Sequence, residues 1–200
     1  SLKGTAKDLK LPRHNLWIYP DKMDHDSLVE NYLKDQNADF PLIYISFPSA
    51  KDPTWNTRYP NTSTIDIITL LPYEAFAKWE GSSWKKRDES YEKLKDSICQ
   101  RLLSHLFKQL PNLKGSIDHY ELSSPLTTKN FVNYQKGELY GLEHTPKRFS
   151  QKFLKPKTSI KGLYLTGQDI VSAGIGGALF SGLITASSIT GINFMKKIYK

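Results

Sequence analysis

The residues with the clearest chemical potential lie near the end of the chain, where a short apolar run meets a polar turn and a group of glycines. The run is Leu163–Leu165, the polar turn follows at 166–169, and Gly174, Gly176 and Gly177 open an apolar stretch. This order predicts a buried strand, an elbow and a helix that begins at the glycines. Glycines admit a ligand or a neighbouring backbone closely, and the free N–H groups of a first helical turn favour a partner with negative charge. A phosphate, a carbonyl oxygen or the edge of a flavin ring would suit such a site.

Asp169 narrows these options, because a carboxylate repels a phosphate but accepts hydrogen bonds well from sugar hydroxyls. We therefore expect Asp169 to contact the sugar or polyol chain of a nucleotide. The spacing is not that of the first turn of a dinucleotide-binding fold, since Leu179 occupies the third glycine position and no acidic residue follows about twenty residues later. The alternative interpretation is a tightly packed core helix whose glycines merely admit a neighbour.

The composition is that of an ordinary globular protein with a basic surface. The chain has 200 residues, of which 38% are hydrophobic and 24% charged, and its net charge is +8. This length suffices for one sizeable core, or for one large domain plus a piece of another. Because no RNA-binding signature or basic repeat accompanies the charge, we predict no nucleic-acid partner. The basic residues are expected to form a solvated face or to contact a membrane surface peripherally.

The cysteine and histidine content predicts no metal site. Cys99 is the only cysteine in the sequence, which excludes an intrachain disulfide, and it falls on an amphipathic helix where a buried side chain is expected. The five histidines lack metal-ligand spacing. The chain starts with a polar, lysine-rich segment that is unlike a signal peptide, so we expect a cytoplasmic or peripherally membrane-associated protein.

Apolar periodicity predicts an α+β fold. Expected strands lie at 14–19, 42–47, 64–71 and 116–122, with 42–47 and 64–71 as a hairpin-like pair and 64–71 as a central strand. Expected helices lie at 27–33, 87–110 and 128–134, with a short helical turn at 72–79 and a last helix after the glycines.

Three motifs carry a resemblance to a known family. The sequence Leu163-Tyr-Leu-Thr-Gly-Gln-Asp169 followed by Gly174-Ile-Gly-Gly-Ala178 resembles the C-terminal flavin-binding signature of FAD-dependent oxidoreductases of the phytoene desaturase, carotenoid isomerase and retinol saturase group. The loop Pro48–Trp55, with Arg58, Pro60 and Ser63-Thr64, is similar to a segment of the retinol saturase branch. Ser124–Thr127 followed by Gly137, Tyr140-Gly-Leu142 and His144 resembles the segment that precedes the final flavin strand in that family.

This resemblance implies a division of the chain within an α/β FAD-binding enzyme. Residues 1–150 would be part of a substrate-binding domain, an antiparallel or mixed sheet with flanking helices, and residues 151–200 the C-terminal strand, glycine turn and helix of the FAD-binding domain. The implied cofactor contacts are Gly167, Gln168, Asp169, Gly174, Ile175, Gly176 and Gly177. The implied wall of the substrate pocket is Tyr140, Gly141 and Leu142.

The resemblance also implies that most contacts to FAD lie elsewhere, because no G-x-G-x-x-G follows an N-terminal strand in this sequence. We therefore expect the C-terminal fragment of a longer oxidoreductase that saturates, desaturates or isomerises a lipophilic polyene. The fragment alone should be inactive and should bind flavin weakly or not at all. The alternative is a non-catalytic lipid- or membrane-surface-binding α+β module in which Gly167–Gly177 is purely structural.

Several points stay open at this level. The sequence assigns no catalytic residue and no role to Lys51 or Asp52. It also leaves open the polyene, the direction of the reaction, the electron donor or acceptor, and the oligomeric state.

Overall fold

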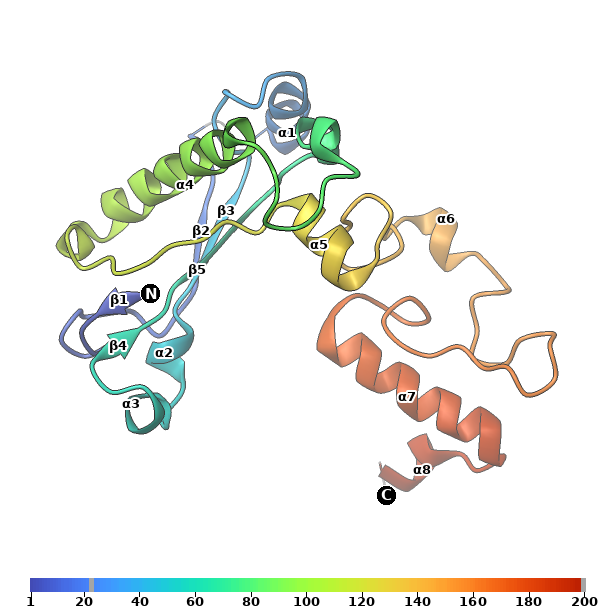
Figure 1. Cartoon of the computed structure of the whole chain (residues 1–200). Coiled ribbons are helices and arrows are strands. Elements are labelled where there is room, and N and C mark those ends of the chain that lie inside the picture. The colour runs from blue at the N-terminus through green and yellow to red at the C-terminus, as the bar shows by residue number, and fades with distance from the viewer. Residues whose placement is uncertain (22–23, 199–200) are drawn as a thin grey trace. The chain divides into compact units, whose positions relative to one another are not determined.

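The structure, a computed structural model, describes residues 1–21 and 24–198 and forms two compact units. Unit 1 is Ser1–Gly137 and unit 2 is Glu138–Lys200 (Figure 1). The predicted boundary at 150/151 separates a substrate-binding part from an FAD-binding part, and it stays a prediction.

Of the strands and helices in the described residues, unit 1 contains all the strands and most of the helices. Its elements are β1 (Leu2–Lys3), β2 (Leu16–Ile18), α1 (His25–Lys34), β3 (Ile43–Ser46), α2 (Pro48–Lys51), α3 (Trp55–Arg58), β4 (Thr62–Ser63), β5 (Asp66–Thr69), α4 (Glu89–Gln109) and α5 (Pro125–Val132). Short 3-10 turns lie at Tyr73–Ala75, Ala77–Trp79 and Pro111–Leu113. Unit 2 contains α6 (Pro146–Phe149), α7 (Gly174–Thr190) and α8 (Phe194–Ile198). Helices combined with small antiparallel sheets confirm the α+β class.

The larger sheet is antiparallel with the order β2-β3-β5. Its three strands fall inside the segments predicted at 14–19, 42–47 and 64–71, and the expected pairing of the last two is confirmed. The prediction that 64–71 is a central strand is wrong, because β5 lies at the edge and β3 at the centre. The apolar run that suggested a central strand has one face turned outward, where Ile68 is 44% exposed.

The strand predicted at 116–122 is also wrong. A second, two-stranded sheet joins β1 to β4, and Ile117 forms only an isolated bridge to Leu2 beside it. The backbone of this segment exchanges hydrogen bonds with Ser1 and Lys3: Lys3 N–H donates to Ser116 O (2.9 Å), Asp118 N–H to Ser1 O (3.0 Å), and the Ser1 ammonium to His119 O (2.7 Å). Partners at so few positions are not enough to extend a ladder.

Helix α4 covers one face of the larger sheet and closes the core of unit 1 (Figure 1). Asp88 caps its first turn by accepting from Tyr91 N–H at 3.1 Å, and its apolar stripe is buried as the 3–4 spacing predicts. Cys99 lies on this stripe and is buried as expected, and burial raises the pKa of its thiol. The buried apolar side chains of this core include Leu2, Tyr32, Ile43, Ile45, Phe47, Phe76, Trp79, Tyr91, Ile98, Leu102, Leu106 and Leu126.

In unit 2, a long loop that contains the short helix α6 leads to the helices α7 and α8. Helix α7 begins at Gly174, as predicted, and ends at Gly191, which takes the left-handed conformation (φ 72°) that favours glycine. The strand predicted at Leu163–Leu165 is wrong, because Tyr164 forms only an isolated bridge to Lys157. A strand needs a neighbour along its length, and here the neighbour is a two-residue stretch, where Pro156 O accepts from Leu165 N–H at 2.8 Å.

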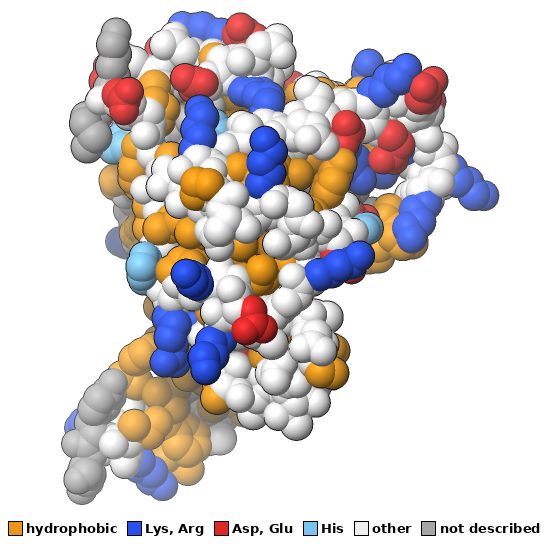
Figure 2. All heavy atoms as spheres, turned by 90° about the vertical axis from the view of Figure 1, so that its left-hand side faces the viewer, with side chains coloured by type: hydrophobic (Ala, Val, Ile, Leu, Met, Phe, Trp, Pro, Cys, Tyr) orange, Lys and Arg blue, Asp and Glu red, His pale blue; other side chains and the backbone are white. Residues whose placement is uncertain are grey.

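Charged side chains are spread over the surface. Figure 2 shows Lys and Arg interspersed with neutral and hydrophobic side chains over much of the visible face. This distribution fits the expected solvated basic surface.

Candidate functional site

The elbow before α7 is held by polar side chains of that helix. Gly167 has φ 103°, and its N–H donates to Ser181 Oγ at 2.8 Å. One turn further along α7, Thr185 Oγ1 donates to Leu165 O at 2.9 Å. Both hydroxyl side chains are buried. The turn therefore has a fixed position relative to the helix, as a binding elbow requires.

The first turn of α7 is partly capped and partly open. Gln168 Oε1 accepts from Gly174 N–H at 3.2 Å, and His144 Nε2 accepts from Ala173 N–H at 2.7 Å. The N–H groups of Ile175 and Gly176 belong to the same turn and have no acceptor within the helix. Ile175 is 90% exposed. The positive end of a 17-residue helix thus offers donors to an approaching acceptor.

The glycines of this turn serve two different purposes. A Cβ on Gly177 would lie 1.9 Å from Ser172 O, so this glycine lets the preceding loop cross the helix closely. A Cβ on Gly176 would meet nothing within 4 Å. The packing interpretation therefore explains Gly177, whereas Gly176 leaves open space where a ligand could approach.

Asp169 contacts the segment that the sequence assigned to the substrate pocket. Its Oδ1 accepts from Leu142 N–H at 2.8 Å. Gly141, at φ 70°, lies so close that a Cβ there would be 2.2 Å from the same oxygen. Tyr140 also has a left-handed backbone (φ 69°), and its side chain is exposed. The structure thus brings Asp169, Gly141 and Leu142 into contact, whereas Tyr140 projects away into solvent.

Arg148, which sequence reasoning passed over, connects these pieces. It is 8% exposed, and its guanidinium donates to Leu142 O and to Gln168 O, each at 2.9 Å. The Nη1 atom also lies 3.0 and 3.1 Å from the two ring nitrogens of His144. The Leu142 peptide is therefore held on both sides, its N–H by Asp169 and its C=O by Arg148. We call Leu142, His144, Arg148, Gln168 and Asp169 the elbow clamp.

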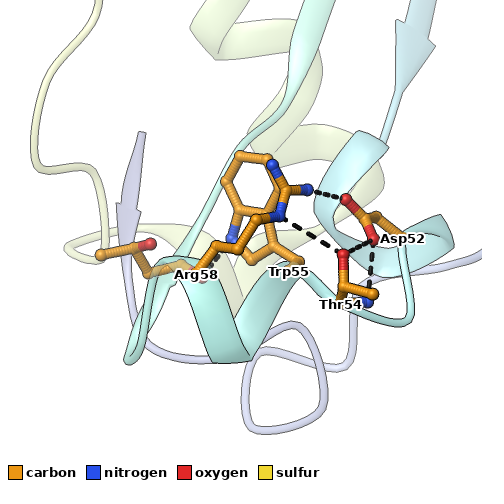
Figure 3. Close-up of polar contacts among 5 residues, drawn as sticks. Asp52, Thr54, Trp55 and Arg58 are labelled. Carbon is orange, nitrogen blue, oxygen red and sulfur yellow. Dashed lines mark hydrogen bonds and ion pairs between the residues drawn. The ribbon is translucent and has the colours of Figure 1, made fainter.

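The loop of the second sequence motif, which begins at Pro48 in unit 1, is stabilised by contacts among its own side chains. Asp52 accepts from both the N–H and the hydroxyl of Thr54 at 2.8 Å and forms an ion pair with Arg58 (Figure 3). Arg58 lies over the ring of Trp55, whose indole N–H donates to Thr62 O at 3.0 Å. The Thr54 hydroxyl is the main cause that lowers the pKa of Asp52. Asp52 thus has a structural role in this loop.

Lys51, next to Asp52, reaches away from the loop. Its ammonium donates to Ser46 Oγ at 2.9 Å and to Asn15 Oδ1. Both partners belong to the three-stranded sheet or its flank, so Lys51 is positioned over that sheet and not within its own loop.

No helix in the described parts of the chain combines the length and the apolar character needed to cross a membrane.

Comparison with known proteins relates nearly the whole chain to two groups of enzymes. It is 36% identical to human all-trans-retinol 13,14-reductase over 195 residues, which is 94% of this chain and 32% of the relative. It is 33% identical to a zebrafish protein described as an inactive all-trans-retinol 13,14-reductase, over 93% of the chain. It is 27% identical to chloroplastic prolycopene isomerase 2 of an Oncidium hybrid cultivar, over 89% of the chain and 29% of the relative.

The chain spans about a third of the length of these relatives. No protein-family model matches the chain, and no solved structure matches it.

Proposed function

Because the chain belongs to the retinol saturase and carotenoid isomerase family over the segment that it covers, we propose that it is part of an FAD-dependent oxidoreductase acting on a conjugated polyene lipid. The observation that carries the proposal is the elbow clamp, which joins the motif expected at the cofactor to the motif expected at the substrate through the Leu142 peptide. A shared site would explain why Asp169, from the cofactor motif, binds the backbone of Leu142, from the substrate motif.

The residues at the start of α7 fit a flavin nucleotide. The open space at Gly176 and the N–H groups of the first turn suit the acceptor atoms of a flavin edge. Asp169 uses one oxygen for Leu142, and a carboxylate has capacity to accept further bonds from ribityl hydroxyls. Bound FAD would supply the transfer of hydride or electrons to or from the polyene. The role of this chain would be to bind, orient and exclude water, with Gly141 and Leu142 forming part of the pocket wall.

The names of the relatives support the proposed substrate class. Their names specify all-trans-retinol and prolycopene, both of which are conjugated polyenes. We propose a substrate of this class, with the rest of the longer protein supplying most of the FAD contacts. FAD-binding fold membership, with residues 151–200 as the last piece of that domain, is part of the same proposal.

The test is the visible spectrum of the full-length protein, followed by identification of any chromophore released on denaturation. We expect flavin bands and released FAD, whereas residues 1–200 alone should be colourless. Asp169→Ala should reduce FAD content, and Glu143→Ala, which removes an exposed carboxylate from the same unit, should not. A full-length protein that stays colourless after incubation with FAD would refute the proposal.

A second candidate, contact with a membrane surface, is favoured by the apolar side chains that α7 presents outward. Ile175 and Leu179 are 90% and 75% exposed, and hydrophobic side chains gather over the C-terminal helices in the distant lower part of Figure 2. Sedimentation of the full-length protein with anionic vesicles would support this candidate if Leu179→Ser weakened it. Sedimentation that is absent, or unaffected by this substitution, would leave these side chains to be covered by the rest of the longer protein.

A further inference from the structure

A cavity in unit 1 separates the edge of the larger sheet from the segment that follows α4. One wall is formed by 64–67, which includes the start of the edge strand β5, and the other wall by 119–122. Side chains of α4, among them Leu102 and Leu106, form its floor, and its volume is about 250 Å³. Ser1 and Leu2 also line the cavity, so β1 enters it from one end (Figure 1).

Strand β1 pairs with the continuation of both walls. On one side it pairs with β4, where Leu2 lies opposite Ser63. On the other side Leu2 forms the bridge to Ile117. The chain that extends β1 in the same direction would therefore run between the two walls.

The first wall directs backbone groups into the cavity. Alternate residues of a strand turn their N–H and C=O groups to opposite sides. Thr64 turns both groups toward Ser49, whose hydroxyl donates to Thr64 O at 3.2 Å and accepts from Thr64 N–H at 3.0 Å. By alternation, Ile65 and Ile67 turn theirs toward the cavity. Such an edge is a template for a further strand.

The second wall begins with a β-bulge. Ser1 O lies opposite two N–H groups, those of Asp118 at 3.0 Å and His119 at 3.5 Å, and the Ser1 nitrogen donates to His119 O at 2.7 Å. Two residues opposite one define a bulge, and the extra residue shifts the alternation by one. Tyr120 accordingly turns toward α4, where its hydroxyl donates to Asp96 Oδ1 at 2.8 Å. This segment is thus already paired in the manner of a strand where it meets β1.

We infer that the cavity holds an extended segment of the longer protein, namely the residues that directly precede Ser1, as a strand paired with both walls. We call this segment the bridging strand. The inference rests on the proposed function only in that the chain belongs to a longer protein, of which it spans about a third. The preceding residues are the favoured occupant because they continue β1, which already lies in the same ladder. A strand of a second copy would have to enter against the end of β1.

The register of the bridging strand follows from β1 and the bulge. Its first and third residues, counted back from Ser1, alternate with Leu2, which is buried, so their side chains should contact α4 and be apolar. Its second residue should point outward. The expected opposite residues are Ile65 and Tyr120 for the first, Asp66 and Glu121 for the second, and Ile67 and Leu122 for the third.

The experiment uses the full-length protein with pairs of introduced cysteines, and mass spectrometry identifies the peptides that a disulfide joins. Asp66 and Glu121 are exposed, and the second residue of the bridging strand should lie between them. A cysteine there should form a disulfide with Asp66→Cys in one variant and with Glu121→Cys in another. Opposite Cα atoms of paired antiparallel strands lie about 4.5–5.5 Å apart, within the reach of a disulfide.

Two controls test the register and the spacing. A cysteine at the third residue of the bridging strand should not link to Asp66→Cys, because its side chain points to the other face. The variant with both Asp66→Cys and Glu121→Cys should also stay unlinked, because two strand spacings, about 9.6 Å, exceed the reach of a disulfide.

Hydrogen exchange of the unmodified full-length protein gives a measurement that needs no substitution. The amides of Ile65, Ile67 and Glu121 should exchange at least about a hundredfold more slowly than unprotected amides, because the bridging strand accepts from them. Fast exchange at all three would overturn the inference even if the cysteine variants failed to fold.

The other outcomes identify other occupants. A disulfide between two copies of the protein would assign the cavity to a second copy, and a direct link between Asp66→Cys and Glu121→Cys would mean that the walls close on each other. Slow exchange without either expected disulfide would mean that something else covers the cavity. Each of these results would overturn the bridging strand. Flavin content bears on the proposed function alone, so the two proposals can fail separately.

Discussion

Replacing Arg148 by methionine should loosen the elbow clamp without unfolding unit 1. The side chain is buried, and its two contacts to carbonyl oxygens, Leu142 O and Gln168 O, are both 2.9 Å long. A hydrogen bond that involves a charged group contributes about 1.5–3 kcal/mol. The segment lies at a partly exposed turn, so we take the lower end for each and expect a loss of about 3 kcal/mol in the free energy of local opening.

Hydrogen exchange of backbone amides measures this opening directly. Leu142 N–H is held by Asp169 and Ala173 N–H by His144, so both amides report on the clamp. A loss of about 3 kcal/mol corresponds to exchange that is about a hundredfold faster. Amides of α4, in unit 1, should exchange at the wild-type rate.

Two further variants make the result specific. Arg148→Lys keeps the charge but lacks the planar fork that reaches two carbonyls, so it should recover only part of the protection. Lys147→Met removes the adjacent, exposed charge and should have no effect. The reasoning would be refuted if Arg148→Met and Lys147→Met changed exchange at Leu142 and Ala173 equally.

The remaining predictions concern packing and pH. Gly177→Ala should destabilise unit 2 by about 1–3 kcal/mol because its Cβ meets Ser172 O, whereas Gly176→Ala should be neutral or stabilising; exchange protection of α7 measures both. Hydrogen bonds from Ser90 and Trp79 lower the pKa of Asp88, so its stabilising effect is present above its ordinary pKa and is lost as pH falls through the lowered value. The urea midpoints of wild type and Asp88→Ala should therefore converge as pH falls below the ordinary pKa of an aspartate. Leu106→Ala, in the core, should cost about 2–5 kcal/mol in thermal unfolding, against less than about 0.5 for Lys93→Ala on the exposed side of α4.

Local patterns were sufficient to predict the parts of the fold that depend on local interactions. Helix α4 follows from apolar residues at spacings of three and four behind an Asp88 cap, and β3 follows from alternating Ile43 and Ile45. The errors concern partners. The segment 163–165 is apolar like a strand but forms a single bridge, at Tyr164. The segment 64–71 has apolar residues on both faces, yet its strand β5 lies at an edge, because pairing is decided by residues far away in the chain.

The candidate site shows the same limit. The glycines and Asp169 were identified from their spacing, whereas Arg148 belongs to a pair of basic residues that resembles any solvated surface. Its burial depends on carbonyls six and twenty residues away, which no local pattern encodes. The local signal that could have drawn attention to this segment is Thr145-Pro146, which predicts a capped helix start two residues before Arg148.

The clamp changes how a substitution at Asp169 has to be interpreted. Asp169→Ala removes a carboxylate expected at the flavin, but it also releases Leu142 N–H, so a loss of FAD could follow from either change. Asp169→Asn separates the two, because an amide oxygen can still accept from Leu142 while the negative charge is gone. If the charge binds the polyol chain directly, Asp169→Asn should lose FAD about as strongly as Asp169→Ala while Leu142 stays protected from exchange. If Asp169 acts only through the turn, Asp169→Asn should retain both the protection and the flavin.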